Sequence, residues 1–407
     1  MKVLFLTIGR FDNIQEQGIY TDLLRKFKAN GHDVYVVCAR ERRQKKPTEY
    51  VEDNGIHILR VKTGNITKTK NLVKKGVSTL LLGYQYKKAI KKYLKHVNFD
   101  LVLYSTPPIT LSSVINHIKK KHNARTYLLL KDIFPQNAVD LGMLSKTGIK
   151  SIVYKYFRQK EKRLYTISDR IGCMSKANVE YVLKHNPEVS RDRVEICPNS
   201  IEIRDMLLEE EERIETRQKY GLPLDKKVFV YGGNLGKPQG IPFIIQCLKT
   251  IELNSNAFFL IVGDGTEYGK LVSYVEEARP QNIRLLNKLP KEEYDRMIAS
   301  CDVGMIFLDH RFTIPNFPSR LLSYMQAGLP VLACTDLNTD IGQIITEGGF
   351  GWWCESNNPD RFADFVNEIC SMNNEQYNQL KNKSIQFLYE HYSIDKCYEI
   401  IMKEFVL

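Results

Sequence analysis

The stretch NFPSRLLSYMQAGLPV, residues 316–331, places a proline, a serine and an arginine at the start of a short amphipathic run. Pro318 and Ser319 are of the types that open helices, where the first backbone N–H groups lack partners within the helix. Those N–H groups, the positive end of the helix dipole and the guanidinium of Arg320 would together attract an anion. These residues alone leave two interpretations open: a phosphate site, or an ordinary capped helix with a solvated arginine.

A glycine-rich loop, YGGNLGKPQG at residues 231–240, lies between a strand-like and a helix-like segment. Gly233 and Gly236 allow tight turns and a close approach of the backbone to a ligand, and Lys237 adds a positive charge for phosphate. The spacing fits neither the GxGxxG pattern nor the GKS/GKT phosphate loop, so the standard modes of nicotinamide or ATP binding are not indicated. A plain turn is the alternative.

Two further loops follow apolar segments in the second half of the chain, IVGDGTE at residues 261–267 and NKLP at residues 287–290. In parallel sheets, ligands bind beside the carboxyl ends of the strands. These two loops fall at such ends, and so do the glycine-rich loop and the NFPSR segment. Together they predict a phosphate and nucleotide site in the second half.

The corresponding loops of the first half are TIGRFDNIQEQG, STPP and KDIFPQ. Gly18 opens a helix-like run and would let the backbone approach a ligand. Asp132 follows the apolar run YLLLK, where a carboxylate could act as a base or orient another group, and it could equally cap the next turn. The histidines and the nine scattered cysteines have no metal-ligand spacing, and no acidic pair is placed like a DxD metal motif.

Charge divides the chain into unlike halves. Residues 1–200 contain 38 basic and 17 acidic residues, and residues 201–407 contain 21 and 30, so their net charges are +21 and −9. This asymmetry predicts two domains, one of which meets nucleic acid, a phospholipid surface or a phosphorylated substrate. No recognised nucleic-acid-binding motif accompanies the charge, so we expect no nucleic-acid partner.

Apolar strand-like segments alternate with helix-like segments along the whole chain, and the pattern restarts after residue 220. Such alternation favours parallel sheets covered on both faces, and two sets predict two doubly wound α/β domains. We place these domains at residues 1–200 and 201–384, because a polar, acidic segment marks the join. The last helical run, about residues 376–406, could belong to either domain.

The opening apolar run, Val3–Ile8, is typical of a buried strand and not of a signal peptide. No run of 18 apolar residues could span a bilayer, and singly scattered cysteines are typical of a reducing compartment. We therefore expect a cytoplasmic protein.

Residues 71–96 interleave apolar residues and tyrosines with lysines, among them Lys87, Lys88, Lys91 and Lys92. This pattern predicts either a basic amphipathic helix on an anionic membrane surface or a packed helix with a lysine-rich solvent face.

The order of these motifs resembles bacterial nucleotide-sugar glycosyltransferases of the retaining family 4. More closely it is similar to the capsule and O-antigen subgroup that includes fucosaminyltransferases. The matching segments, which run from residue 1 to about residue 355, are NGHDVYVV, DLVLYSTPP, LKDIFPQ, VEICPNSIE, GGNLGKPQGI, LIVGDGTE and PSRLLSYMQAGLPV. The resemblance implies a GT-B fold, in which two Rossmann-like domains face each other across a cleft. It also implies that the first domain holds the acceptor, that the second holds the donor, and that a helix at about 385–407 packs back on the first.

The resemblance further implies roles for single residues. Lys237 and Arg320 would contact the donor diphosphate, and backbone near Gly263 and at Lys288 and Leu289 would hold the base. The other donor-site residues expected on this basis are Gly18, Gly233, Asn234, Gly236, Asp264, Ser319 and Ser323.

The implied reaction is retaining and needs neither a metal nor a cofactor. A UDP-linked sugar, such as an N-acetylated amino or deoxy sugar, would be transferred to a lipid-diphosphate-linked saccharide at the inner face of the cytoplasmic membrane. Catalysis would consist of stabilising the leaving diphosphate and positioning the acceptor hydroxyl. The candidate catalytic residues are Asp132, Lys131, Lys237 and Arg320.

The sequence departs from the family pattern at four positions. Pro315 and Ser323 stand where the family often has two glutamates, Asn234 replaces an arginine, and Lys131 replaces a histidine. Contacts to ribose and donor sugar therefore cannot be carried over from the glutamates. Two alternatives stay open: a non-catalytic subunit of glycosyltransferase type, and a hydrolysing UDP-sugar 2-epimerase, for which we find no carboxylate–histidine set.

Overall fold

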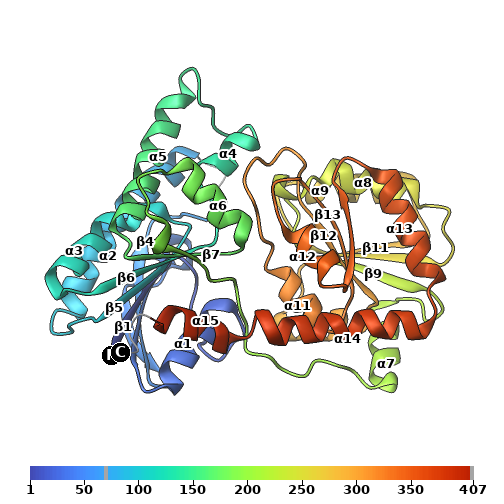
Figure 1. Cartoon of the computed structure of the whole chain (residues 1–407), viewed down its shortest axis with the longest axis horizontal. Coiled ribbons are helices and arrows are strands. Elements are labelled where there is room, and N and C mark those ends of the chain that lie inside the picture. Colours follow the sequence, from blue (N-terminus) through green and yellow to red (C-terminus); the bar gives the residue numbers. More distant parts are fainter. Residues whose placement is uncertain (68–71, 404–407) are drawn as a thin grey trace. The chain divides into compact units, whose positions relative to one another are not determined.

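The structure is a computed structural model that describes residues 1–67 and 72–403 (Figure 1). The chain forms two compact units. Unit 1 comprises Met1–Glu202 and the segment from Ile394 onward, and unit 2 comprises Ile203–Ser393. The returning C-terminal segment thus begins at Ile394, later in the chain than the sequence suggests.

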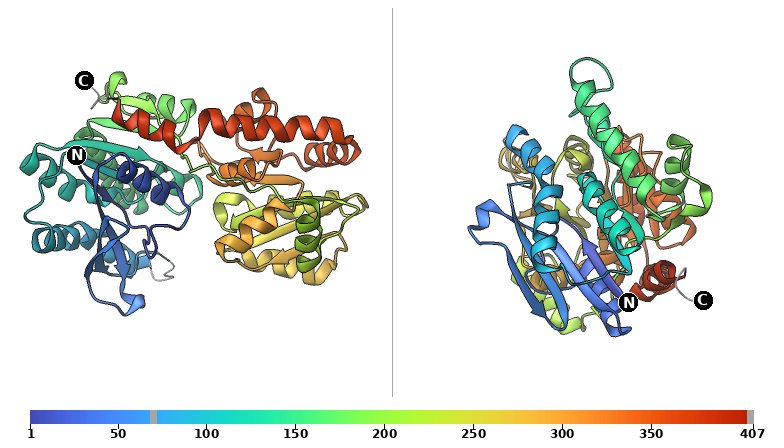
Figure 2. Two further views of the ribbon diagram at one scale, coloured as in Figure 1. Left: turned by 90° about the horizontal axis from the view of Figure 1, so that it is seen from below. Right: turned by 90° about the vertical axis from the view of Figure 1, so that its left-hand side faces the viewer.

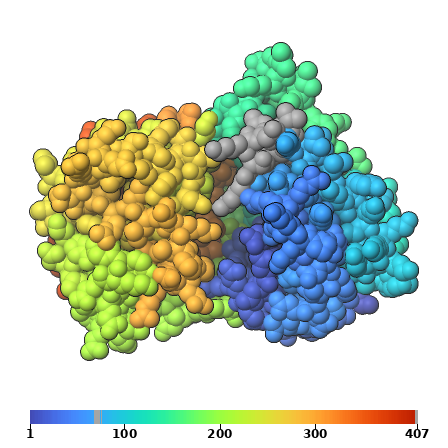
Figure 3. All heavy atoms as spheres, turned by 180° about the vertical axis from the view of Figure 1, so that it is seen from behind, coloured from blue at the N-terminus to red at the C-terminus, as the bar shows by residue number. Residues whose placement is uncertain are grey.

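Unit 1 contains an eight-stranded sheet within the described residues. Its strands are β1 (Lys2–Leu6), β2 (Asp33–Glu41), β3 (Glu49–Asp53), β4 (Ile56–Thr63), β5 (Leu101–Ser105), β6 (Arg125–Leu130), β7 (Arg170–Cys173) and β8 (Val194–Ile196). They lie in the order β3-β4-β2-β1-β5-β6-β7-β8. Neighbours are parallel except β3 and β4, an antiparallel pair at the edge that is visible at the surface in Figure 3.

Helices cover both faces of the unit 1 sheet. They are α1 (Ile19–Ala29), α2 (Leu72–Tyr93), α3 (Ser112–His122), α4 (Gln136–Asp140), α5 (Lys150–Ile167), α6 (Lys176–His185) and α15 (Ile394–Met402), with 3-10 turns η1 (Arg42–Gln44), η2 (Ile109–Leu111) and η3 (Arg191–Arg193). Buried side chains of α2, α3, α5 and α6 form the core on one face. Those of α1 and α15 form the core on the other face, where these two helices lie side by side (Figure 2).

Unit 2 contains a six-stranded parallel sheet in the order β11-β10-β9-β12-β13-β14. In chain order these strands are β9 (Lys227–Asn234), β10 (Ala257–Asp264), β11 (Ile283–Leu286), β12 (Val303–Phe307), β13 (Val331–Thr335) and β14 (Gly351–Glu355). This is the order 3-2-1-4-5-6, which is typical of Rossmann-type folds, and the winding direction reverses between β9 and β12.

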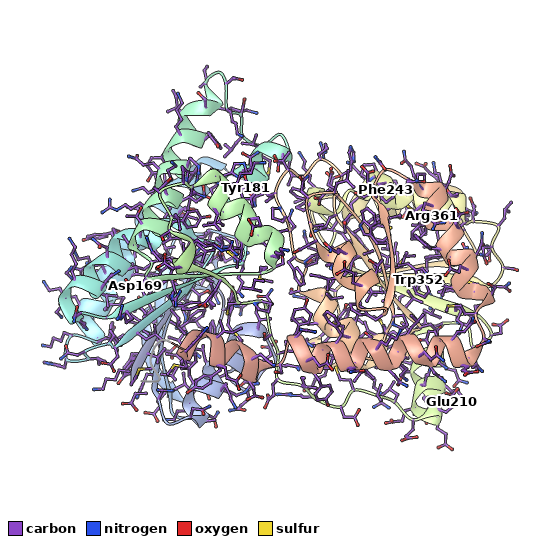
Figure 4. All side chains as sticks on the ribbon, viewed as in Figure 1. Asp169, Tyr181, Glu210, Phe243, Trp352 and Arg361 are labelled. Carbon is purple, nitrogen blue, oxygen red and sulfur yellow. The ribbon has the colours of Figure 1, made fainter. Side chains whose placement is uncertain are left out.

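Helices of unit 2 pack against its sheet, and their buried side chains share its core. They are α7 (Glu210–Tyr220), α8 (Ile241–Thr250), α9 (Tyr268–Ala278), α10 (Lys291–Ala299), α11 (Arg320–Gln326), α12 (Ile341–Glu347), α13 (Pro359–Ser371) and α14 (Asn374–His391), with the 3-10 turn η4 (Lys237–Gln239). Phe243 of α8 and Trp352 of β14 belong to the core between them (Figure 4). The last helical run of the sequence is two helices, α14 and α15, which are separated at the buried residue Tyr392.

The predicted fold class, two doubly wound α/β domains, is confirmed. Its physical basis is visible in β5, β12 and β13, whose residues are buried throughout because helices cover both faces of each sheet. Among the helices that the structure describes, none combines the length and the apolar character needed to cross a membrane.

Candidate functional site

The candidate donor site of unit 2 lies where the strand order reverses. β9 and β12 are neighbours at that point, and Rossmann-type sheets bind ligands beside the carboxyl ends of such strands. The glycine-rich loop follows β9. Gly263 and Asp264, which end β10, pair with Gly233 and Asn234 at the end of β9. The fold therefore gathers at one edge the loops that the sequence assigns to a single site.

Glycines let two strand ends and an arginine approach closely. A Cβ atom added to Gly263 would lie 1.9 Å from the carbonyl oxygen of Gly233. A Cβ atom at Gly233, whose φ is +130°, would lie 3.3 Å from Nη2 of Arg320. Any side chain at Gly263 would thus force β9 and β10 apart at this edge. Gly233 itself is exposed, so its backbone is open to a ligand.

Arg320 is the cation at the centre of this arrangement. Its guanidinium lies over the ring of Tyr231, with 4.2 Å between Cζ and the ring centroid. Its Nη1 atom is buried and has no hydrogen-bond partner among the described residues. A buried cationic N–H group without a partner is costly, so an anionic ligand at this atom would be stabilising.

The tyrosines around Arg320 do not neutralise it. Burial raises the pKa of Tyr231, and it raises the pKa of Tyr324 to about 12, although Arg320 opposes both shifts. Both phenols are therefore uncharged at neutral pH. The hydroxyl of Tyr324 accepts a hydrogen bond of 3.1 Å from the backbone N–H of Gly232, which ties α11 to the glycine-rich loop.

Gln239 fixes the glycine-rich loop from within. Its buried Oε1 atom accepts hydrogen bonds from Nδ2 of Asn234 at 2.8 Å and from the backbone N–H of Gly236 at 3.2 Å. The amide of Asn234 is therefore already engaged. Lys237 is exposed on η4, and its ammonium makes no ion pair or hydrogen bond with the described residues.

Ser319 and Ser323 have different surroundings. Ser319 is exposed at the N-cap position of α11, with φ −65° and ψ −15°, and its side chain makes no capping hydrogen bond. The hydroxyl of Ser319 is thus not used as the capped-helix interpretation requires. Ser323 lies one turn into α11 and is half-buried.

The remaining donor-site candidates line the same edge. Asp264 is exposed, and its carbonyl oxygen accepts a 2.8 Å hydrogen bond from the N–H of Leu235, which joins β10 to the glycine-rich loop. Lys288 is exposed and Leu289 is half-buried in the loop that follows β11. β11 is two strands away from β9, so these two residues lie toward one side of the edge.

Asp309 is a residue that the sequence reasoning missed. It follows β12 at the reversal point, and its N–H donates to the carbonyl oxygen of Pro238 at 2.9 Å. Its buried carboxylate accepts hydrogen bonds of 2.8 and 2.7 Å from Arg311. Burial opposes ionisation of Asp309, but Arg311 holds its pKa below the usual range. The sequence could have indicated Asp309 as a site residue, because this aspartate closely follows an apolar strand-like segment.

Asn316 was also missed as a single residue, although it opens the NFPSR segment. Its Nδ2 atom is buried and has no hydrogen-bond partner among the described residues, while its carbonyl oxygen accepts a 2.6 Å bond from Thr339. It is therefore a second buried donor near the start of α11 that a ligand oxygen could satisfy.

In unit 1, Asp132 lies just after β6 in a polar loop. Oγ1 of Thr106 accepts hydrogen bonds from the N–H groups of Lys131 (3.0 Å) and Asp132 (3.1 Å), and Nδ2 of Asn137 donates to Asp132 at 2.7 Å. Burial raises the pKa of Asp132 to about 6, against the opposing effect of Asn137. Burial also raises the pKa of Tyr20, to which the charge of Asp132 contributes.

Lys131 and the backbone of Gly18 already make hydrogen bonds with other groups of unit 1. Nζ of Lys131 donates to the carbonyl oxygen of Cys197 at 3.3 Å. The N–H of Gly18 donates to the buried carboxylate of Asp22 at 3.0 Å, and Asp22 also pairs with Arg25 at 2.7 Å. The Gly18 N–H is thus not free to bind a donor phosphate.

The four candidate membrane lysines lie on α2. Lys87, Lys88, Lys91 and Lys92 are all exposed, whereas the opposite side of this helix is buried in the core. The second half of α2 therefore packs on the core and presents these lysines outward, and their role at a membrane surface stays a prediction. Within residues 1–67 and 72–403, no three His, Cys, Asp or Glu side chains come together as a metal site requires.

Two family models match successive parts of this chain. The model described as Glycosyltransferase Family 4 matches residues 19–205, and the model described as Glycosyl transferases group 1 matches residues 212–387. Among curated proteins, "Probable glycosyltransferase WbjE" of Pseudomonas aeruginosa is 26% identical over 328 residues, which cover 80% of this chain and 79% of WbjE.

Solved structures agree on the fold. HepE of Anabaena, in complex with UDP-glucose, is similar with a TM-score of 0.70 and 13% identity, covering 100% of this chain and 99% of HepE. WaaG, described as a glycosyltransferase involved in lipopolysaccharide biosynthesis, is similar with a TM-score of 0.66 and 14% identity, covering 98% of this chain and 99% of WaaG.

Fold and matched domains together define a glycosyltransferase of the GT-B class. The model described as Glycosyltransferase Family 4 covers most of unit 1 and the model described as Glycosyl transferases group 1 covers most of unit 2, so each unit is similar to a glycosyltransferase domain. These matches support the transferase activity expected from the sequence, while family 4 membership and the capsule and O-antigen subgroup stay predictions.

Proposed function

We propose that this protein transfers a sugar from a nucleoside-diphosphate donor, a UDP-linked one, to a lipid-diphosphate-linked saccharide in capsule or O-antigen synthesis. The observation that carries the proposal is the Nη1 atom of Arg320 beside Gly233 of β9, which is buried and has no hydrogen-bond partner in the part of the chain that the structure describes. A diphosphate supplies the anion that this atom lacks, and the missing side chain at Gly233 leaves room for it.

The chemical task is to break the bond between the anomeric carbon and the diphosphate. Negative charge develops on the leaving group, and Arg320, the exposed side chain of Lys237 and the exposed backbone of Gly233 would stabilise it. No step of this kind needs a metal, because the positive groups belong to the chain. We infer a retaining, metal-independent transfer in which no covalent intermediate is required.

Asp132 would act on the acceptor side. With a pKa of about 6, its carboxylate is ionised at neutral pH and can accept a hydrogen bond from the acceptor hydroxyl. In this role kcat/KM rises as the pH increases through about 6, and Asp132→Asn removes that dependence. A profile that keeps its acid limb in Asp132→Asn would assign the limb to another group.

The relatives support this donor and this pathway. HepE is a structural neighbour in complex with UDP-glucose, and WaaG is described as acting in lipopolysaccharide biosynthesis. A lipid-linked acceptor also accounts for the excess of basic residues in unit 1. Lys87, Lys88, Lys91 and Lys92 would meet the anionic membrane surface. Changing all four to Glu should weaken binding to anionic vesicles, and unchanged binding would exclude this role.

The test is a transfer assay in EDTA with UDP-, GDP- and dTDP-sugars and lipid-linked saccharides extracted from bacterial membranes. Wild type should release one nucleoside diphosphate only when acceptor is present, and the new glycosidic bond should keep the anomeric configuration of the donor. Nucleotide binding without turnover would favour the non-catalytic subunit. Release of a free 2-epimer without acceptor would favour the epimerase.

A further inference from the structure

Exposed apolar side chains form a stripe along the first turns of α5. Ile149 is 89% exposed, Ile152 70%, Val153 45% and Tyr156 37%. Their spacing of three, four and seven residues puts them on one side of the helix. Met143, in the segment before α5, is also exposed. Isolated exposed apolar residues are ordinary, but a continuous helical stripe is typical of a surface that binds something.

Positive charge surrounds the α5 stripe. Residues 141–160 contain five basic residues and no acidic one. Lys150 and Lys155 are exposed beside the stripe, and Nζ of Lys160 lies 5.3 Å from the ring centroid of Tyr156. An apolar stripe flanked by lysines is the pattern of a helix that lies in the interface of an anionic bilayer.

The position of the stripe follows from the topology of unit 1. α5 connects the parallel strands β6 and β7, so it runs against them and begins at their carboxyl edge. At 1.5 Å per residue its 18 residues extend roughly 27 Å, whereas the six residues of β6 extend about 20 Å. The first turns of α5 and the segment before it therefore protrude, and Figure 3 draws them in teal-green at its top.

The first half of α2 has a matching stripe. Val77, Leu80, Leu81 and Tyr84 are exposed with the same three, four and seven spacing. α2 connects β4 to β5 on the face of the sheet that α5 also covers, so both helices begin at the same edge (Figure 2). Two helices of one layer thus leave apolar side chains uncovered at the edge where parallel sheets bind ligands.

We propose that the α5 stripe docks unit 1 onto an anionic phospholipid surface, with its isoleucines in the headgroup boundary and its lysines on the phosphates. The lysines decide the occupant, because a second copy of this chain would bring them against each other, whereas anionic lipid attracts them. This docking surface deepens the proposed use of a lipid-linked acceptor, but it does not depend on the transfer reaction.

The experiment is co-sedimentation of the full chain with vesicles of phosphatidylcholine and phosphatidylglycerol, and with vesicles of phosphatidylcholine alone. Ile149→Ser with Ile152→Ser should weaken binding to the anionic vesicles by about tenfold or more, because two apolar anchors are lost. The matched control is Leu224→Ser with Leu253→Ser, two exposed leucines of unit 2, which should bind like wild type. All four positions are exposed, and equal melting temperatures would show that folding is unchanged.

Charge is tested separately by Lys150→Ala with Lys155→Ala, which should weaken binding to anionic vesicles and reduce its dependence on salt. Wild-type binding by the double isoleucine variant would overturn the proposal. So would light scattering that finds a wild-type dimer, a monomeric isoleucine variant and no binding to vesicles. Because no nucleotide sugar is present, failure of the transfer assay leaves this result unaffected.

Discussion

The loops at the carboxyl edges of the two sheets differ in whether their hydrogen-bonding groups already have partners. In unit 2, buried donors of Arg320 and Asn316 lack partners among the described residues, and Gly233 leaves the space beside Arg320 free of a side chain. In unit 1, the N–H of Gly18 is bound by Asp22, and Asp132 is bound by Asn137. The first edge therefore has donors for the anion that we propose, whereas the second presents a carboxylate that Asn137 holds in place.

Net charge alone would place an anion site in unit 1 and not in unit 2, where we propose it. The chain from residue 201 onward is acidic overall, yet the proposed diphosphate site lies there, because in our proposal the guanidinium of Arg320 and nearby backbone would bind the ligand at short range. The basic half carries its charge on exposed lysines, which act on a broad anionic surface. Local geometry therefore predicts a small-ligand site, and summed charge predicts a surface partner.

The largest effect is expected from a substitution that breaks the close contact between the ends of β9 and β10 in unit 2. Gly263→Ala places a Cβ atom 1.9 Å from the carbonyl oxygen of Gly233 and should lower the free energy of unfolding by about 3 kcal/mol. Gly269→Ala in α9, where a Cβ would meet nothing within 4 Å, is the control and should raise stability by about 0.5 to 1 kcal/mol. Calorimetric melting of unit 2 measures both. Equal melting of Gly263→Ala and wild type would contradict the tight contact.

Two aspartates of unit 1 should respond oppositely to pH. Asp132 has its pKa raised by burial to about 6, so the stability that it contributes falls as the pH rises from the usual carboxylate range through 6. Asp169 (Figure 4) is held below its usual pKa because Lys119 and Thr126 outweigh its burial, so its contribution is present at neutral pH and is lost on acidification.

At pH 8, Asp132→Asn should therefore raise the free energy of unfolding by on the order of 1 kcal/mol, and Asp169→Asn should lower it by a similar amount. The difference between Asp132→Asn and wild type should disappear near pH 4. Denaturant titrations at both pH values measure this. If both variants changed the free energy of unfolding in the same direction, burial would not be destabilising the charged carboxylate of Asp132.

A smaller effect sharpens the description of the unit 2 site. Tyr231→Leu removes the ring beneath Arg320 and should weaken UDP binding about threefold to fivefold. Tyr231→Phe keeps the ring and loses only the hydroxyl, which donates to the carbonyl oxygen of Asn234 at 2.8 Å. It should therefore weaken binding less. Equal losses would mean that the hydroxyl, and not the ring face, positions the arginine.

Most of the fold could be predicted from sequence, because strands buried on both faces are continuous apolar runs. The edge pair β3 and β4 was harder. Glu49–Asp53 is short and contains three acidic residues and no continuous apolar run, and its partner is set by an antiparallel turn at Asn54 and Gly55. The break between α14 and α15 was also missed, because both helices have helical periodicity and the buried ring of Tyr392 separates them only through tertiary packing.

The candidate site could be predicted in outline and not in detail. Glycine-rich strand ends and Arg320 are recognisable by residue type and position. The pairing of Gly18 with Asp22, the engagement of Asn234 by Gln239 and the uncapped Ser319 depend on contacts that spacing does not reveal. The exposure of Ile149 and Ile152 could not be predicted from spacing either, since apolar residues at helical spacing usually mark a buried face.

The most direct measurement of the central claim is calorimetric titration of UDP in EDTA against wild type, Arg320→Ala and Arg361→Ala. Arg361 is a matched control, since it lies 4.1 Å over the ring of Phe365 but belongs to α13, outside the loops of the proposed site (Figure 4). Loss of charged hydrogen bonds to the diphosphate should weaken UDP binding about tenfold to a hundredfold in Arg320→Ala and not in Arg361→Ala. If Arg320→Ala binds UDP as wild type does, the diphosphate site is not where we place it.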